Sequence, residues 1–139
     1  MKILIINGPN LNMLGKRNTK HYGELTLDEI NKLIKKTYPN VKFYFYQTNN
    51  EARIIWKLQA MKNIDALIIN PAAFTHTSIA IRDMLEIIKI PKVEVHLSDI
   101  NTREDFRKID YIKDVVDKVI MGKKENSYIE AVKYLLENK

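Results

Sequence analysis

The chain has 139 residues, 45% of them hydrophobic, which suffices for one folded domain with a core. It contains no cysteine, which excludes disulfide bonds, thiolate metal sites and cysteine nucleophiles. A formal net charge of +6 comes from 23 Lys and Arg residues against 17 Asp and Glu residues, with acids between bases nearly everywhere. This mixture indicates a solvated surface whose positive field could help to collect a small anion. It disfavours nucleic-acid binding, which calls for a clustered basic patch.

We expect no membrane partner and a cytoplasmic location. The N-terminal stretch MKILIINGPN has a short apolar run broken by Asn, Gly and Pro, and it lacks the cleavage site of a signal peptide. No apolar stretch approaches the ~20 residues that span a bilayer. The absence of cysteine fits a reducing compartment.

Five apolar runs rich in β-branched or aromatic residues predict strands. In chain order they cover residues 3–6, 41–46, 66–69, 93–95 and 119–121. The runs ILII and ALII are continuous rather than alternating, as expected for parallel strands that are buried on both faces.

Segments with helical periodicity separate these runs. Thr26 with Glu29, and Ser127 with Glu130, have the spacing of a capping box, and further helices are expected after Asn50 and Ser78. Strand and helix therefore alternate, which favours parallel strands joined by right-handed crossovers. We predict an α/β fold, a flavodoxin-like three-layer sandwich with a five-stranded parallel sheet of order 2-1-3-4-5. It would form a single domain over residues 1–139.

Polar side chains gather where four of the strands end, the edge at which such sheets bind ligands. These residues are Asn7 and Asn10, Gln47 and Asn49, the stretch 70–78, and His96, Ser98 and Asp99. Helix capping explains Asn49 and Ser78. It does not explain His76 and His96, two of the three histidines, so we predict a functional site here.

The segment GPNLNMLGKRNTKHYGELT, between the first strand and the first helix, is long for such a connection and holds three of the four glycines. It is either a surface loop or a lid. It lacks the fingerprint of a nucleotide loop. A zinc site is disfavoured because His76 and His96 lack a convincing third ligand. Acid–base chemistry remains: Tyr22 lies near Arg17 and other cations that would favour a phenolate, which can act as a general base.

Three blocks of the sequence resemble the signatures of the type II 3-dehydroquinate dehydratases. They are INGPNLNMLGKR…YG…TLDEI, NPAAFTHTSIAIRD and EVHLSD…REDFR, and they occur in the family's order. Their internal spacings also match, since Arg17 lies five residues before Tyr22 and His76 lies six after Asn70. The likeness extends over most of the chain.

The resemblance implies loss of water from 3-dehydroquinate by anti elimination through an enolate, with no metal, cofactor or covalent intermediate. In this family pattern Tyr22 matches the base, Arg17 its stabilising cation, His96 the proton donor and Asn10 the support of the enolate oxygen. Residues matching substrate contacts are Asn70, His76, Leu97 through its backbone, Ser98 and Arg107. Asp83 matches a residue that reaches a neighbouring subunit's site, in a dodecamer built from trimers. Glu94 could orient His96, or the two could merely be neighbours on one strand face.

Several positions depart from the family's usual pattern. They are Asn18 and Thr19 in the long loop, Gln59, Asp99, and Lys124 with Ser127 before the last helix. None is a matched catalytic residue. Two other interpretations stay open: a non-catalytic relative that binds a small acid, and an unrelated flavodoxin-like protein that binds a nucleotide or flavin. The absence of a phosphate-binding loop after the first strand disfavours the second.

Overall fold

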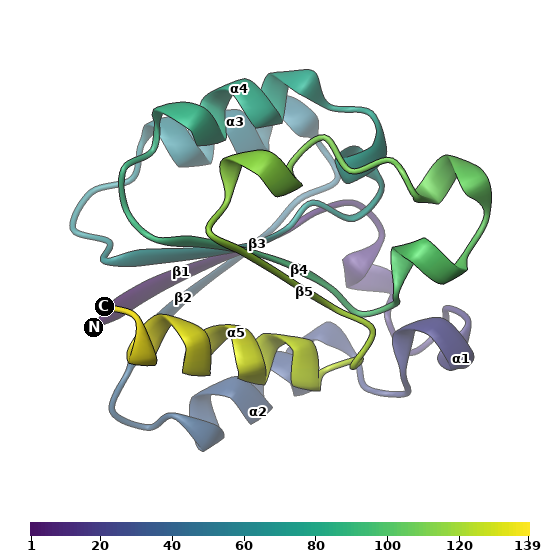
Figure 1. Cartoon of the computed structure of the whole chain (residues 1–139). Coiled ribbons are helices and arrows are strands. Elements are labelled where there is room, and N and C mark those ends of the chain that lie inside the picture. The colour runs from purple at the N-terminus through teal and green to yellow at the C-terminus, as the bar shows by residue number, and fades with distance from the viewer.

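The computed structural model describes residues 1–139 and contains one sheet of five parallel strands (Figure 1). The strands are β1 (Lys2–Asn7), β2 (Lys42–Gln47), β3 (Ala66–Asn70), β4 (Lys92–His96) and β5 (Lys118–Met121). Their order is β2-β1-β3-β4-β5, which confirms the predicted flavodoxin-like topology. All five predicted strands lie within one residue of the observed bounds at each end.

Two helices cover each face of the sheet. Helices α2 (Leu27–Thr37) and α5 (Asn126–Glu137) lie on one face, and α3 (Glu51–Gln59) and α4 (Ile79–Ile87) lie on the other (Figure 1). A short helix, α1 (Thr19–Tyr22), lies in the long loop after β1. Five 3₁₀ turns complete the chain: η1 (Leu11–Met13), η2 (Ala72–His76), η3 (Ile100–Thr102), η4 (Asp105–Arg107) and η5 (Lys113–Val115). None of the helices combines the length and apolar character needed to cross a membrane.

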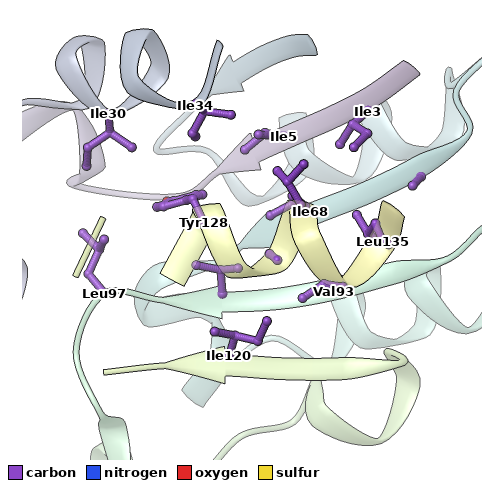
Figure 2. Packing of buried hydrophobic residues seen from close by; sticks show 14 of the residues in the cluster. Ile3, Ile5, Ile30, Ile34, Ile68, Val93, Leu97, Ile120, Tyr128 and Leu135 are labelled. Carbon is purple, nitrogen blue, oxygen red and sulfur yellow. The ribbon is translucent and has the colours of Figure 1, made fainter. Parts of the chain in front are cut away.

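The core has two halves because successive residues of a strand point to opposite faces. Ile3 and Ile5 of β1 pack on the face covered by α2 and α5, against residues such as Tyr128 (Figure 2). Leu4 and Ile6 pack on the other face, beneath α3 and α4. Both faces of β1 and β3 are therefore buried, which explains why their sequences are continuously apolar.

Three of the four predicted helix starts are confirmed. Thr26 and Glu29 form the complete capping box, and the side chains of Asn50 and Ser78 accept backbone N–H groups of α3 and α4. The predicted capping box at Ser127 is wrong. Helix α5 begins at Asn126, two residues before the start that a cap at Ser127 would give, and the buried Ser127 hydroxyl accepts the N–H of Lys123 at 3.1 Å.

That error has a local cause. Lys124 lies in the left-handed region with φ 53°, so the chain turns sharply before α5 and the helix begins immediately after the turn. Glu130, expected to reach back to the cap, instead forms an ion pair with Lys123, with Nζ and Oε2 2.7 Å apart.

A buried polar network ties β1, β3 and α5 together beneath the carboxyl edge of the sheet. Asn7 and Asn70 are paired in register at the ends of β1 and β3. The Tyr128 hydroxyl donates to Asn7 Oδ1 at 2.5 Å and accepts from Asn70 Nδ2 at 2.9 Å. Burial raises the pKa of Tyr128, so this phenol stays neutral. The network fixes the ends of β1 and β3, from which the two following segments of the chain diverge.

Candidate active site

An open cavity lies at the carboxyl ends of β1, β3 and β4, the edge at which such sheets bind ligands. Figure 1 shows α1 and the turns that follow β4 gathered at this edge of the sheet. The structure brings nine of the ten predicted site residues to the cavity wall. They are Asn10, Arg17, Tyr22, Asn70, His76, His96, Leu97, Ser98 and Arg107.

The turn after β1 approaches β3 closely and sets Asn10 on the cavity wall. The N–H of Gly8 donates to the Asn70 carbonyl at 2.8 Å, and a Cβ at Gly8 would lie 2.5 Å from the Pro71 carbonyl oxygen. Only glycine fits at that distance. Asn10 follows in a left-handed conformation with φ 67°, and its N–H donates to Asn49 Oδ1 at 3.0 Å.

Tyr22 is positioned by α1. Asn18 caps this helix, because its side chain accepts the N–H of Lys20 at 2.9 Å, and Gly23 ends the helix with φ 82°. The departure at Asn18 therefore supports the turn that carries Tyr22. The guanidinium of Arg17 lies over the Tyr22 ring, 3.8 Å from its centroid.

Arg103 is the functional residue that the sequence interpretation missed. Its Nη1 donates to the Tyr22 hydroxyl at 2.6 Å and to Ser98 Oγ at 3.3 Å, and it lines the cavity. The available signal was its place in REDFR, seven residues after His96. A charged donor on the phenolic oxygen interacts with that atom more directly than a cation above the ring does.

The cavity is strongly cationic. Arg17, Arg103 and Arg107 all line it, and no Asp or Glu does. Burial lowers the pKa of Arg17; Arg103 and Arg107 lower it further, while Tyr22 opposes the shift. The Nε of Arg103 is buried without a hydrogen-bond partner. Glu104, which does not line the cavity, pairs with Arg103 at 3.7 Å and with Arg107 at 3.1 Å. Three guanidinium groups against this one outlying carboxylate leave an excess of positive charge, which indicates an anionic ligand.

His96 is the last residue of β4, and the buried carboxyl of Glu94 contacts its ring on the side away from the cavity. Its Nε2 lies 2.5 Å from Glu94 Oε2, and Thr75 Oγ1 donates to the same oxygen at 2.9 Å. This hydrogen bond decides the question left open for Glu94, which orients the ring. Burial raises the pKa of Glu94 to about 7 and lowers that of His96. The Nδ1 of His96 has no partner in the chain, so this nitrogen is available to a ligand.

His76, Asn70 and Ser98 present polar groups to the same cavity. His76 is oriented through its Nδ1, which lies 2.7 Å from the Ile109 carbonyl and donates to it, leaving Nε2 free as an acceptor. Burial lowers the pKa of His76, which favours this neutral form. Asn70 is held by Tyr128 and by the Ala72 N–H, which donates to its Oδ1 at 3.1 Å. Leu97 and Ser98 supply the wall immediately after β4.

Asp83 is the predicted site residue that lies elsewhere. It is exposed on α4 and does not line the cavity of its own chain. The departures Asp99 and Gln59 also lie outside the cavity. Asp99 caps η3 by accepting the N–H of Asn101 at 3.0 Å, and Gln59 is exposed at the end of α3.

The structure brings a third acidic group to His96 that the sequence did not indicate. One ligand atom each from Glu94, His96 and Asp110 lie within 4.8 Å of one another. These residue types can hold a metal ion, but His76 is not in the cluster, so the prediction that His76 and His96 share no third ligand is not contradicted. A metal would have to replace the hydrogen bond between His96 and Glu94. That the protein acts without a metal stays a prediction.

The fold and the site together define an α/β protein in which a phenol flanked by arginines shares one cationic cavity with a histidine that a buried carboxyl orients. This is a site for acid–base chemistry on a small acid. Comparison with known proteins is more specific. Residues 1–136 match the model of the family described as dehydroquinase class II, and the chain belongs to this family.

Several relatives support this membership. A 3-dehydroquinate dehydratase of Hydrogenovibrio crunogenus is 52% identical over 123 residues, covering 86% of this chain and 85% of the relative. One from Thermotoga neapolitana is 47% identical over 137 residues, covering 97% and 94%. The crystal structure of the type II dehydroquinase of Butyrivibrio crossotus superposes with a TM-score of 0.94 at 41% identity, covering 98% and 97%.

Proposed function

We propose that this protein is a 3-dehydroquinate dehydratase, which removes water from 3-dehydroquinate to give 3-dehydroshikimate in the shikimate pathway to aromatic amino acids. One observation carries the proposal. Tyr22, held by Arg17 and Arg103, shares a cationic cavity with His96, so that a base, its stabilising cations and an acid face one anion. Family membership supplies the substrate.

The elimination requires a base for a proton next to a ketone. Tyr22 as phenolate removes the C2 proton, and the electron pair moves onto the ketone oxygen to form an enolate. Arg103 donates to the phenolic oxygen and Arg17 lies over the ring, so both stabilise the charged base. Asn10 supports the enolate oxygen, since developing negative charge is best met by donors already in place.

The leaving hydroxyl requires an acid. His96 protonates it, the C–O bond breaks as the enolate collapses to the conjugated enone, and water departs. Glu94 holds the ring through Nε2, so Nδ1 is the nitrogen that meets the substrate. The substrate carboxylate and hydroxyls are bound by Asn70, His76, Leu97, Ser98 and Arg107, with Asp83 of a neighbouring subunit completing the site.

The proposal extends to assembly and cellular context. We assign a dodecamer built from trimers, a cytoplasmic location, and no metal, cofactor, nucleic-acid or membrane partner. The family resemblance supports the assembly, and the cysteine-free composition fits a reducing compartment. A non-catalytic relative that binds a small acid is the alternative. Retention of both Tyr22 and Arg17 favours the enzyme.

The direct test is to add 3-dehydroquinate and follow the absorbance of the conjugated enone, with and without a chelator. Product formation that is insensitive to the chelator supports the proposal. Binding of the substrate without product would establish the non-catalytic alternative. A chelator-dependent rate would instead assign a metal to the cluster of Glu94, His96 and Asp110.

The Tyr22→Phe variant tests the base. Phenylalanine keeps the ring under Arg17 but cannot take a proton, so we expect kcat to fall by at least ~10²-fold. Substrate binding, measured by calorimetry, should stay near the wild-type value. Retention of more than about a tenth of kcat would show that Tyr22 is not the base.

A further inference from the structure

Asp110 stands close to the acid of the site without touching the cavity. It is not a lining residue, and neither is Glu94. Yet a carboxylate oxygen of Asp110, one of Glu94 and a ring nitrogen of His96 all lie within 4.8 Å of one another. Glu94 is fully buried, and its Oε1 has no hydrogen-bond partner. Two carboxyls and one imidazole therefore share a small volume.

The segment that carries Asp110 is fixed against η2. The Tyr111 N–H donates to the Thr75 carbonyl at 2.9 Å, and His76 Nδ1 donates to the Ile109 carbonyl at 2.7 Å. Asp110 lies between these two anchors, and its place beside Glu94 is a property of the fold.

The backbone turn at Asp110 does not require a charge. Its Oδ1 accepts the N–H groups of Ile112 at 2.8 Å and Lys113 at 3.1 Å, a turn that asparagine forms equally well. These two donors and the partial solvent exposure of Asp110 favour its ionised form over that of the fully buried Glu94. The hydrogen bond between the two carboxyls acts against this order, since it raises the pKa of Asp110 and lowers that of Glu94.

The charges around Asp110 come from three places. Glu94 and His96 face it from β4, His76 from η2, and Lys113 from its own segment; Arg107 lies near His76. Burial and then the charge of Glu94 raise the pKa of Asp110 to about 7. Burial lowers the pKa of His96, and Asp110 opposes that shift. A negative charge here thus acts on the proton affinity of the whole pair.

We propose that Asp110 is a positioning residue for acid catalysis: its carboxylate retains one proton on the Glu94–His96 pair through neutral pH, which His96 then passes to the leaving hydroxyl. The inference rests on the proposed dehydration. Without the negative charge of Asp110 beside it, the Glu94–His96 pair would release that proton at lower pH. His96 would then be a neutral ring with no proton to donate to the leaving hydroxyl.

The protein gains and loses equal numbers of protons in one turnover. Tyr22 gains the C2 proton, His96 loses one to the departing water, and the Glu94–His96 pair is left one proton short beside ionised Asp110. Two adjacent carboxylates then draw a proton back from solvent, while Tyr22 returns its proton to solvent. No net proton is consumed, as the dehydration requires.

The test is the pH profile of kcat for Asp110→Asn. Asparagine keeps the turn but cannot ionise, so we expect the basic limb of the profile to move to lower pH by about one unit. Asp114→Asn is the matched control. Asp114 is an exposed acid of the same segment, 3.8 Å from Arg82, and its loss should leave the limb in place. An unmoved limb in Asp110→Asn, or an equal shift in both variants, overturns the inference.

A second readout needs no substrate. The ring ¹⁵N shifts of His96, followed against pH in the ligand-free protein, report the loss of the pair's proton. Their midpoint should be lower in Asp110→Asn than in wild type, and an unchanged midpoint overturns the inference. Asp110→Ser, which keeps a turn acceptor, replaces Asp110→Asn if the latter does not fold. Because this titration is independent of turnover, it separates failure of this inference from failure of the proposed dehydration.

Discussion

Two arginines contact Tyr22 in different ways. Arg17 lies over the ring at 3.8 Å from its centroid, whereas Arg103 donates a hydrogen bond to the hydroxyl at 2.6 Å. A cation over a ring interacts with its face, while a donor on the oxygen stabilises the atom that holds the charge. Removing either cation should slow proton abstraction, and Arg103 should matter more.

The first prediction compares Arg103→Ala with Arg17→Ala. We expect Arg103→Ala to lower kcat by about 10²–10³-fold, as for loss of one donor to a charged oxygen in a catalytic site. Arg17→Ala should lower kcat less. Steady-state kinetics on matched preparations provide the measurement. If Arg17→Ala were the more damaging change, the ring-stacked cation would be the chief stabiliser of the base.

The second prediction concerns the stability cost of the acid cluster. Burial raises the pKa of Glu94 to about 7, and that of Asp110 is raised to about 7 as well. Carboxyls with raised values bind protons more tightly in the folded state, so their contribution to stability is lost as pH rises through the folded pKa. Burial lowers the pKa of His96, so the contribution of His96 to stability rises with pH. This one group opposes two carboxyls, Glu94 and Asp110.

The wild-type free energy of unfolding should therefore fall between about pH 5 and 7. In Glu94→Gln the fall should be smaller by about 1–3 kcal/mol, since one buried carboxyl is gone and Asp110 loses its like-charged neighbour. Urea unfolding at several pH values measures this. A steeper fall in the variant would contradict the assignment of a buried protonated carboxyl to Glu94.

Most residues of the site could be predicted from local sequence, and two could not. Asn70 and His96 are the last residues of β3 and β4. Asn10, Arg17 and Tyr22 lie in the loop after β1, in a motif whose spacing resembles that of the family. Arg103 and Asp110 lie in a segment of 3₁₀ turns with no apolar periodicity. Which of its charged side chains reaches Tyr22 or Glu94 depends on how this segment packs on η2, and spacing along the chain does not encode that.

Some helices and strands are easier to predict from the sequence than others. The strands are predictable because β1 and β3 are buried on both faces and so are continuously apolar. Helix α1 has four residues and no apolar stripe, so only its cap at Asn18 marks it. The start of α5 was mispredicted because the capping pattern at Ser127 competes with a sharp turn at Lys124, and the turn determines where the helix begins.

The third prediction follows from that turn. Lys124 is a non-glycine residue with φ 53°, a conformation that costs a side chain about 1 kcal/mol. Lys124→Gly should raise the free energy of unfolding by about that amount. Lys124→Ala is the control, because alanine keeps the Cβ that causes the strain, and its stability should stay close to wild type. Equal stabilisation by both variants would assign the effect to removal of the lysine charge.

At the scale of the whole molecule, the topology explains why distant segments form one site. The parallel sheet places the ends of β1, β3 and β4 side by side, so the long loop after β1 and the turns after β4 meet over the same edge. This much was predictable from the alternation of strands and helices. The surface of α4 was less predictable, because a helix face that is exposed in one chain can be buried in an assembly.

Helix α4 presents a stripe of Ile79, Asp83 and Ile87, each four residues from the next and therefore on one face. Ile79 is 55% exposed and Ile87 is 65% exposed. Large apolar side chains exposed around one acid are typical of a protein–protein contact. The stripe supports the proposed trimer, in which Asp83 of one subunit would reach the cavity of the next.

The last prediction tests this by complementation. Asp83→Ala should lower activity although Asp83 does not line its own cavity, whereas Glu86→Ala, an exposed acid of the same helix that pairs with Arg82, should not. Light scattering should show a multiple of three chains for all variants.

When Asp83→Ala is unfolded and refolded with an equal amount of Tyr22→Phe, some sites combine an intact Tyr22 with an intact Asp83 from the adjacent subunit. In a closed ring with random mixing, about a quarter of the sites are of this kind, so about a quarter of wild-type activity should return. A monomer with full activity, or no recovery in a mixture shown to contain hybrid oligomers, would confine Asp83 to its own chain.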